Sequence, residues 1–212
     1  MEQNERRLWL IKELLRESSE YRGIMIPKDD DGRRQLLRGL MNVRMPGPIS
    51  RDFVEVQDVY LQEELKRKGI TDVCQLEPLQ DKIYLWRGDI TTLRCDAIVN
   101  AANSGMTGCY HPNHRCIDNC IHTFSGVQLR NACAGIMERQ GHAEGAGHAK
   151  ITEAYNLPCR YVLHTVGPIV HGRLTDRDRE LLADCYRSCL ELAAEKELES
   201  VAFCCISTGE FH

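Results

Sequence analysis

The sequence predicts an α/β protein, in which a mixed sheet flanked by helices follows a helical N-terminal region. Two observations lead to this fold class. Apolar residues recur at helical spacing in three segments before residue 79, whereas short buried-strand patterns alternate with helical patterns from residue 83 onward. Such alternation is typical of a parallel or mixed sheet with helices on its faces. Ligands of these sheets bind at the carboxyl ends of the strands, so the functional residues are expected there.

The N-terminal region, residues 1–79, is expected to form three helices that act as a scaffold. Apolar side chains lie three and four residues apart within Arg6–Leu15 and again within Leu36–Met41. The third helix is expected over Arg51–Lys68, because Ser50 is a suitable N-cap and a basic last turn followed by glycine is a stop signal. No concentration of reactive side chains occurs in this region.

The second region, residues 80–212, carries the strand patterns. Short apolar runs predict buried strands at Ile83–Trp86, Ala97–Val99, Tyr161–Val166 and Val201–Ile206. Between them, apolar residues fall on one face of a helix within Ile117–Phe124 and within Leu181–Leu192.

Composition excludes several functional classes. The net charge of -4, from 27 basic and 31 acidic side chains, gives no broad attraction to nucleic acid or to an anionic membrane. No run approaches the roughly 18 consecutive apolar residues of a membrane-spanning helix, and the charged start Met1–Arg7 does not resemble a secretory signal. We therefore expect a cytoplasmic protein with neither nucleic acid nor membrane as a partner.

Cysteine usage points to thiols and a metal site rather than to disulfides. Eleven cysteines is an odd number, and 212 residues need no disulfide scaffold. Most of the cysteines are expected to be small buried hydrophobic residues, notably Cys185 and Cys189 in a helical pattern and Cys204 and Cys205 in a strand pattern.

A dense cluster between Cys109 and His122 holds three of the eleven cysteines and three of the eight histidines. Four candidate ligands lie in a stretch that Pro112 keeps from forming a regular helix: Cys109, His111, His114 and Cys116. Thiolate and imidazole ligands favour zinc, held by three ligands in a catalytic site or by four in a structural one, and the spacing leaves both open. The alternative is a loop of reduced cysteines and solvent-facing histidines. Cys120 is assigned to the apolar helix face, and His122 is expected to be a helix histidine with satisfied hydrogen bonds.

Two segments are candidate phosphate sites. The helix that begins at Ile117-Asp118-Asn119 has unpaired backbone N–H groups at its start, which attract anions. Asp118 has the plainer alternative of a helix N-cap, a role that is compatible with ligand positioning. The second candidate is Ser207-Thr208-Gly209 after the last strand pattern, where hydroxyl groups and a glycine let the backbone approach an anion.

Four ordered motifs resemble the macrodomain family, whose fold binds ADP-ribose. They are Gly88-Asp89-Ile90-Thr91, Val99-Asn100-Ala101-Ala102-Asn103, the Tyr161–Pro168 run YVLHTVGP, and Ile206–Gly209 (ISTG). Where ordinary macrodomains carry a run of glycines, this chain has Gly108–Asp118 with its cysteines and histidines. That segment resembles the zinc-containing microbial branch, whose members have a helical N-terminal extension and remove ADP-ribose from proteins.

The resemblance implies roles for individual residues. It makes Cys109, His114 and Cys116 the ligands of one zinc ion, Zn2+, and leaves His111 out. It assigns Asp89 and the backbone of Ile90 to the adenine and Asn103 to the distal ribose. The diphosphate would lie between Ile117-Asp118 and the loop Ser207, Thr208, Gly209, Glu210 and Phe211, with Asn103 and Asp118 carrying catalysis. Asp89 as a turn or cap residue and Asn103 as a loop residue are the plain alternatives.

The resemblance also implies an activity and a missing segment. Family members continue past the Ser-Thr-Gly loop, so a chain that stops at His212 is expected to be C-terminally incomplete. The expected activity is zinc-dependent hydrolysis of mono-ADP-ribose from acidic side chains of modified proteins. Its rival is a reader module that binds ADP-ribosylated proteins without cleaving them, since fold alone does not decide between the two. Nucleic-acid binding through a zinc finger lacks both a second ligand pair and a basic face.

Overall fold

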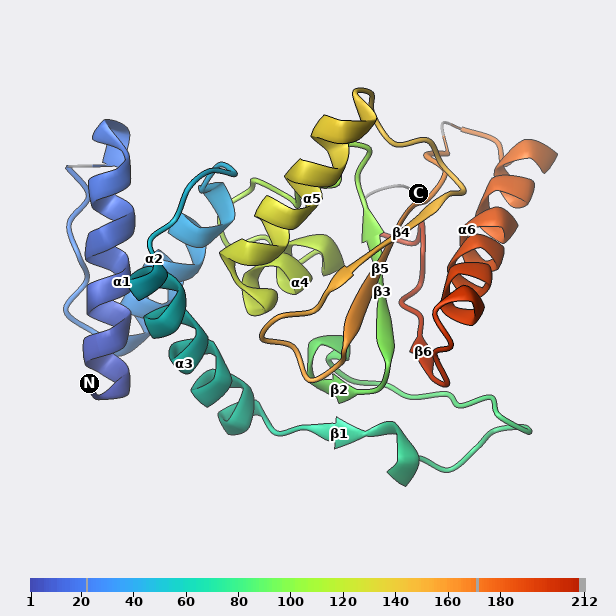
Figure 1. Ribbon diagram of the computed structural model, residues 1–212, viewed down its shortest axis with the longest axis horizontal. Coiled ribbons are helices and arrows are strands. Elements are labelled where there is room, and N and C mark those ends of the chain that lie inside the picture. Colours follow the sequence, from blue (N-terminus) through green and yellow to red (C-terminus); the bar gives the residue numbers. More distant parts are fainter. Residues whose placement is uncertain (22, 171, 210–212) are drawn as a thin grey trace.

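The computed structural model describes residues 1–21, 23–170 and 172–209. A helical layer at the N-terminal end lies beside a sheet that has helices on both faces (Figure 1). In the part of the chain that is described, no helix is both long and apolar enough to cross a membrane. All eleven cysteines lie among these residues as free thiols.

The N-terminal layer consists of α1 (Gln3–Glu17), α2 (Asp30–Val43) and α3 (Arg51–Lys68). The three helices confirm the sequence prediction, and Ser50 caps α3 by accepting from the Phe53 N–H group. They share one apolar core, built from Leu10, Ile11, Leu14, Leu37, Leu40, Met41, Phe53, Tyr60 and Leu61. The side chain of Val127, from the sheet-bearing region, completes this core.

The main sheet is mixed and has the strand order β4-β5-β3-β6. The central strands β3 (Ala97–Ala102) and β5 (Tyr161–Val166) are parallel, β6 (Val201–Ala202) is parallel to β3, and β4 (Ala149–Glu153) runs antiparallel to β5. A separate parallel pair joins β1 (Thr71–Asp72) to β2 (Leu93–Arg94). The mixed sheet flanked by helices is the predicted fold class.

Alternate residues of the central strands enter different cores. Ile98 and Val162 pack with α4 (Ile117–Ser125) and α5 (Val127–Gln140), whereas Val99 and Leu163 pack with α6 (Asp176–Glu195) on the opposite face (Figure 1). This two-residue alternation is the ordinary geometry of a strand that is covered on both sides. Both faces of the sheet are therefore covered, so a ligand can approach it only at the strand ends.

Three predictions about the second region are wrong. Ile83–Trp86 forms no strand: Ile83 makes a single bridge with Gln80, and Leu85 is 82% exposed. The last strand covers only Val201–Ala202 rather than Val201–Ile206. Cys185 and Cys189 are buried as expected, but Cys204 is half-buried and Cys205 is exposed because the strand ends before them.

The sequence patterns also missed α5 and β4. The last turn of helix α5 contains few apolar residues. The buried positions of this helix include a charged residue, Arg130, as well as Leu129 and Cys133. Strand β4 is an edge strand whose first three residues are only half-buried. Neither element therefore has the clean periodicity on which sequence patterns rely.

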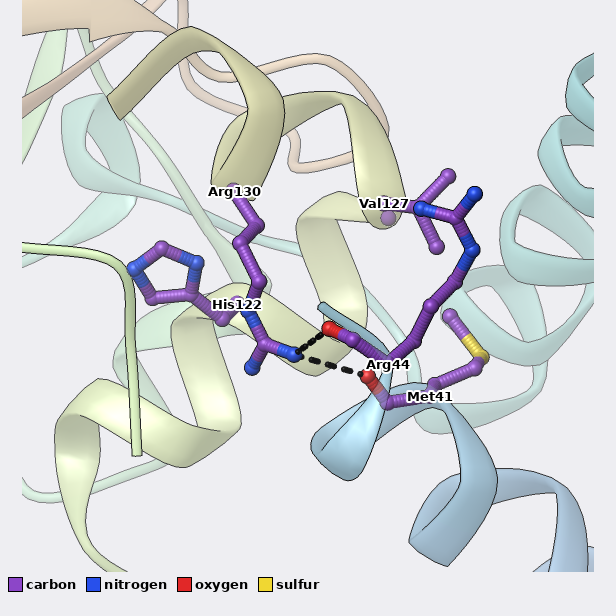
Figure 2. A pocket seen from close by; sticks show the side chains of 6 residues that line it. Met41, Arg44, His122, Val127 and Arg130 are labelled. Atoms are coloured by element: carbon purple, nitrogen blue, oxygen red, sulfur yellow. Dashed lines mark hydrogen bonds between the residues drawn. The ribbon is translucent and has the colours of Figure 1, made fainter. Parts of the chain in front are cut away.

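Arg130 joins α5 to the N-terminal layer. Its Nη1 donates to the carbonyl oxygens of Met41, Asn42 and Arg44 at 3.2, 2.7 and 2.6 Å, which are orphan acceptors at the end of α2. Figure 2 shows this guanidinium directed at the backbone of Met41 and Arg44, beside a cavity of only about 10 Å³. The side chain is 5% exposed, so no bulk water replaces these contacts.

We expect Arg130→Met to lower the free energy of unfolding by about 3 kcal/mol, because several buried carbonyl groups lose a charged donor. Denaturant unfolding followed by circular dichroism measures the change. Arg139→Met is the control, since Arg139 lies on the same helix and is exposed. Equal stability of the two variants would contradict the role of Arg130.

Candidate functional site

One large cavity opens at the carboxyl end of β3 and beside the segment that follows β6. Its volume is about 1410 Å³, and Asn103, the loop 107–116 and the start of α4 line it together with Ser207–Gly209. The last segment comes from the opposite end of the second region, directly after β6. Segments far apart in the sequence therefore meet at the edge of the sheet where a ligand is expected.

Three of the four candidate metal ligands meet in this cavity. The ligand atoms of Cys109, His114 and Cys116 all lie within 4.8 Å of one another, and Cys109 Sγ is 3.5 Å from His114 Nδ1. His111 is outside this group, although its ring lies edge-on to that of His114 at 5.4 Å. Two thiols and an imidazole at this separation are a donor set that suits a tetrahedral zinc ion.

Cys116 has a second structural role. It is the N-cap of α4, and its Sγ accepts from the Asn119 N–H group at 3.4 Å. Burial raises the pKa of this thiol to about 12, so a metal cation would have to displace its proton before it could act as a thiolate ligand. The helix start and the metal-ligand group are thus tied together by one side chain.

Asp118 is not the N-cap that the sequence suggested, because Cys116 occupies that position. The Asp118 side chain points into the protein, where Asn100 Nδ2 donates to Oδ1 at 2.8 Å and Asn103 Nδ2 donates to Oδ2 at 3.2 Å. Burial raises the pKa of Asp118 to about 6 despite these hydrogen bonds. The side-chain amides of Asn100 and Asn103 therefore hold a carboxyl group whose charged form is disfavoured by burial.

Asn103 has the loop role considered for it, whereas its contact with a distal ribose stays a prediction. Its Oδ1 accepts from Gly105 N at 2.9 Å, a turn contact within its own loop. Its Nδ2 donates to Gly108 O at 3.1 Å as well as to Asp118. The side chain lines the cavity, and these hydrogen bonds connect the end of β3 with the loop that leads to Cys109.

The expectation that His122 has satisfied hydrogen bonds is wrong. The ring is buried, and neither nitrogen has a hydrogen-bond partner among the described residues. Its Nε2 lies 3.5 Å from Asp118 Oδ1, and burial lowers the pKa of His122 well below its usual range. Gly108 crosses directly over this ring: a Cβ at that position would lie 2.8 Å from His122 Cγ, so only glycine fits.

A second cysteine and histidine group lies behind the site, formed by His122, Cys133 and His164. Both ring nitrogens of His164 are already engaged, with Asn100 Nδ2 at 3.2 Å and Thr152 Oγ1 at 2.9 Å. Burial lowers the pKa of His164 to about 4, which keeps the ring neutral. In this group the ring nitrogens of His164 are thus engaged in hydrogen bonds, whereas those of His122 have no such partner among the residues described.

The second phosphate candidate is a strained turn. Ser207 has a φ of 56°, and its hydroxyl donates to Pro168 O at 2.8 Å. A Cβ on Gly167 would lie 2.2 Å from Ser207 Oγ, so this turn requires glycine beside it. The Thr208 hydroxyl donates to Cys205 O at 3.0 Å. Both hydroxyl groups therefore hold the shape of the loop, whereas Glu210 and Phe211 lie outside the described residues.

Asp89 and Ile90 do not line the large cavity. Asp89 caps a short turn by accepting from Thr91 N at 3.0 Å, and Lys68 Nζ lies 3.0 Å from its other carboxylate oxygen. The cap role considered for Asp89 is therefore present in the fold. Lys68, the last residue of α3, also lies 3.2 Å from the centre of the Phe124 ring, a contact that no local sequence signal indicated.

Together, the sheet topology and the cavity define an α/β protein with a ligand site at its strand ends. Comparison with known proteins identifies the class. The Macro domain family model matches residues 99–212. A Treponema medium protein named protein-ADP-ribose hydrolase is 62% identical over all of this chain and 82% of its own length. A Staphylococcus aureus protein of the same name is 48% identical over all of this chain and 80% of its own length.

Solved structures agree with this match. The macrodomain of Trypanosoma brucei in complex with ADP-ribose has a TM-score of 0.59 at 32% identity, covering 82% of this chain and 75% of that one. The chain belongs to the Macro domain family.

Sequence patterns did not single out Asn100, which carries the Asp118 contact. We expect Asn100→Leu to lower the free energy of unfolding by about 1.5–3 kcal/mol, since a buried carboxyl group loses its shortest hydrogen bond. Urea unfolding at neutral pH measures this. A variant as stable as the unmodified protein would show that Asn103 alone is sufficient to hold Asp118.

Proposed function

We propose that this protein is a zinc-dependent hydrolase that removes mono-ADP-ribose from acidic side chains of modified proteins. The observation that carries the proposal is the meeting of Cys109, His114 and Cys116 in the same cavity as Asn103 and Asp118. A cavity of about 1410 Å³ exceeds the size of a typical small-molecule site and suits an extended ligand such as a dinucleotide.

The groups around the cavity suit the successive parts of ADP-ribose. The start of α4 directs backbone N–H groups toward the cavity, where they would bind the diphosphate together with the turn Ser207–Gly209. Asn103 would orient the distal ribose beside Asp118. Asp89 and Ile90 would receive the adenine, outside the main cavity. Binding at several points holds the anomeric carbon in one place, which itself lowers the barrier to hydrolysis.

Cys109, His114 and Cys116 would hold the ion. Zinc bound by three protein ligands keeps one position open, and there it can lower the pKa of water to about 7 or polarise a ribose oxygen. Water would displace the protein carboxylate from the anomeric carbon and release ADP-ribose. Asp118, held by Asn100 and Asn103, would accept the proton of that water or fix a ribose hydroxyl.

The relatives support an enzyme rather than a reader. Both relatives are named protein-ADP-ribose hydrolase, and they align with this chain over its whole length, including the helices α1–α3. Their names do not mention a metal, so the zinc dependence rests on the donor set of this chain.

We expect one zinc ion per chain, and we expect Cys116→Ser to lose it together with at least about tenfold in ADP-ribose release. Serine can still cap α4, so the helix start is retained. Elemental analysis, and incubation with protein ADP-ribosylated on acidic residues with and without chelator, measure both effects. Affinity for free ADP-ribose should change less, because the metal acts chiefly in the transition state.

Cys205→Ser is the control, since Cys205 lines the same cavity but lies outside the ligand group. Folded metal-free protein that cleaves at the normal rate would show that the zinc is structural. Zinc-loaded protein that binds ADP-ribose and never cleaves its linkage would support the reader function instead.

We expect Asp89→Ala to weaken ADP-ribose binding about 10- to 150-fold, or roughly 1.5–3 kcal/mol, the usual contribution of a hydrogen bond to a charged group. Isothermal titration calorimetry measures it. Asp72→Ala is a matched control, because Asp72 also caps a short turn and faces a cation, Arg94. If both variants bind normally, Asp89 serves only as a cap.

A further inference from the structure

Helix α2, from the N-terminal layer, lies directly against the loop that carries the metal ligands. Arg38 Nη2 donates to the carbonyl oxygen of His114 at 2.7 Å, a contact between residues 76 positions apart. The same nitrogen donates to Asn119 Oδ1 at 3.1 Å. One guanidinium thus holds the backbone of a candidate ligand and the first turn of α4.

The contact with Asn119 has a further effect on the loop. Because Arg38 occupies Oδ1 of the Asn119 amide, the amide nitrogen faces the loop, where it donates to His111 O at 3.0 Å and to Cys109 O at 3.4 Å. Arg38 therefore supports the backbone of both Cys109 and His114, once directly and once through Asn119.

Asn42 makes a second connection, one turn further along α2. It is 1% exposed, and its Oδ1 accepts from the Asn113 N–H group at 2.9 Å. Asn113 has a φ of 58°, a left-handed conformation that needs support from its surroundings. Asn42 Nδ2 donates to Thr123 Oγ1 at 2.7 Å, so the α2 side chain is fixed between the loop and α4.

Gly39 lies between these two residues and lets the loop approach. It is buried within α2, where glycine costs a helix about 1 kcal/mol relative to alanine. A Cβ at this position would lie 3.3 Å from Asn113 Nδ2 and 3.7 Å from Pro112 Cβ. A longer side chain would push the loop away from α2.

We propose that α2 is a positioning element of the metal site: Arg38, Asn42 and Gly39 hold the loop 109–116 so that Cys109, His114 and Cys116 converge before metal binds. This inference rests on the proposed metal site and extends it to the N-terminal layer. A loop ordered by folding loses less conformational freedom when it binds an ion, so the ion binds more tightly.

The test measures zinc affinity, by competition with a chromophoric chelator, in full-length variants. We expect Arg38→Met to bind zinc about 10- to 100-fold more weakly, the usual effect of losing a group that supports metal ligands. ADP-ribose affinity should change less. Arg34→Met is the matched control: Arg34 lies one turn earlier on α2, and its ion pairs with Asp30 and Glu64 stay within the N-terminal helices. We expect it to keep normal zinc affinity.

Gly39→Leu tests the same contact without removing a hydrogen bond. Leucine favours a helix, so weaker zinc binding in this variant would reflect displacement of the loop and would support the proposal. Wild-type zinc affinity in folded Arg38→Met and Gly39→Leu would overturn it. So would equal losses of zinc affinity in Arg34→Met and Arg38→Met, because the effect would then be one of general stability.

Hydrogen exchange on the unmodified, zinc-free protein tests whether the loop 109–116 is ordered before metal binds. This measurement does not depend on whether the variants fold. We expect the Asn113 amide to exchange at least about tenfold more slowly than an unstructured peptide, because Asn42 accepts its hydrogen. Exchange at the peptide rate would contradict the proposal. If unmodified protein bound no zinc at all, the metal site itself would fail, a result distinct from normal zinc affinity in Arg38→Met.

Discussion

The buried guanidinium of Arg130 is the interaction on which the arrangement of the two regions depends. It donates to carbonyl groups at the end of α2 and, through Nε, to Thr107 O at 2.7 Å, while it stacks on the Tyr110 ring at 4.4 Å. A cation at 5% exposure is tolerated only when its N–H groups are paired. Burial lowers the pKa of Arg130, yet a guanidinium remains charged at any physiological pH. The end of α2 and the loop residues Thr107 and Tyr110 are consequently held to the same side chain.

A second constraint is the polar core behind the cavity. Neutral His164 has Asn100 Nδ2 at one ring nitrogen and Thr152 at the other, and the Asn100 amide then donates to Asp118. Because an ionised Asp118 carboxylate can only accept, the Asn100 amide presents its nitrogen to it, and the His164 nitrogen that faces the same amide nitrogen then accepts. An asparagine turned the other way would present its oxygen to the Asp118 carboxylate and repel it. One asparagine amide therefore links the neutral His164 ring to the Asp118 carboxyl group.

Local signals made much of this fold predictable, while non-local contacts escaped the sequence patterns. Ser50 and the basic last turn gave the bounds of α3, and the density of cysteine and histidine residues pointed to the loop where Cys109, His114 and Cys116 come together. Ile83–Trp86 has the apolar composition of a strand but is largely exposed, because no strand lies beside it to pair along its length. The contacts of Arg38 and Asn42 with the loop link residues more than 70 positions apart, which no periodicity reports.

The N-terminal layer contacts both ends of the proposed ligand site. At one end, α2 contacts the loop 109–116 through Arg38 and Asn42. At the other, Lys68 from the last turn of α3 pairs with Asp89, the residue assigned to the adenine, and lies over Phe124 of α4. Because α2 and α3 share one apolar core with Val127 of α5, a shift of either helix would move both ends of the site together. The helices that the sequence suggested to be a scaffold therefore contact both Asp89 and the loop that carries Cys109, His114 and Cys116.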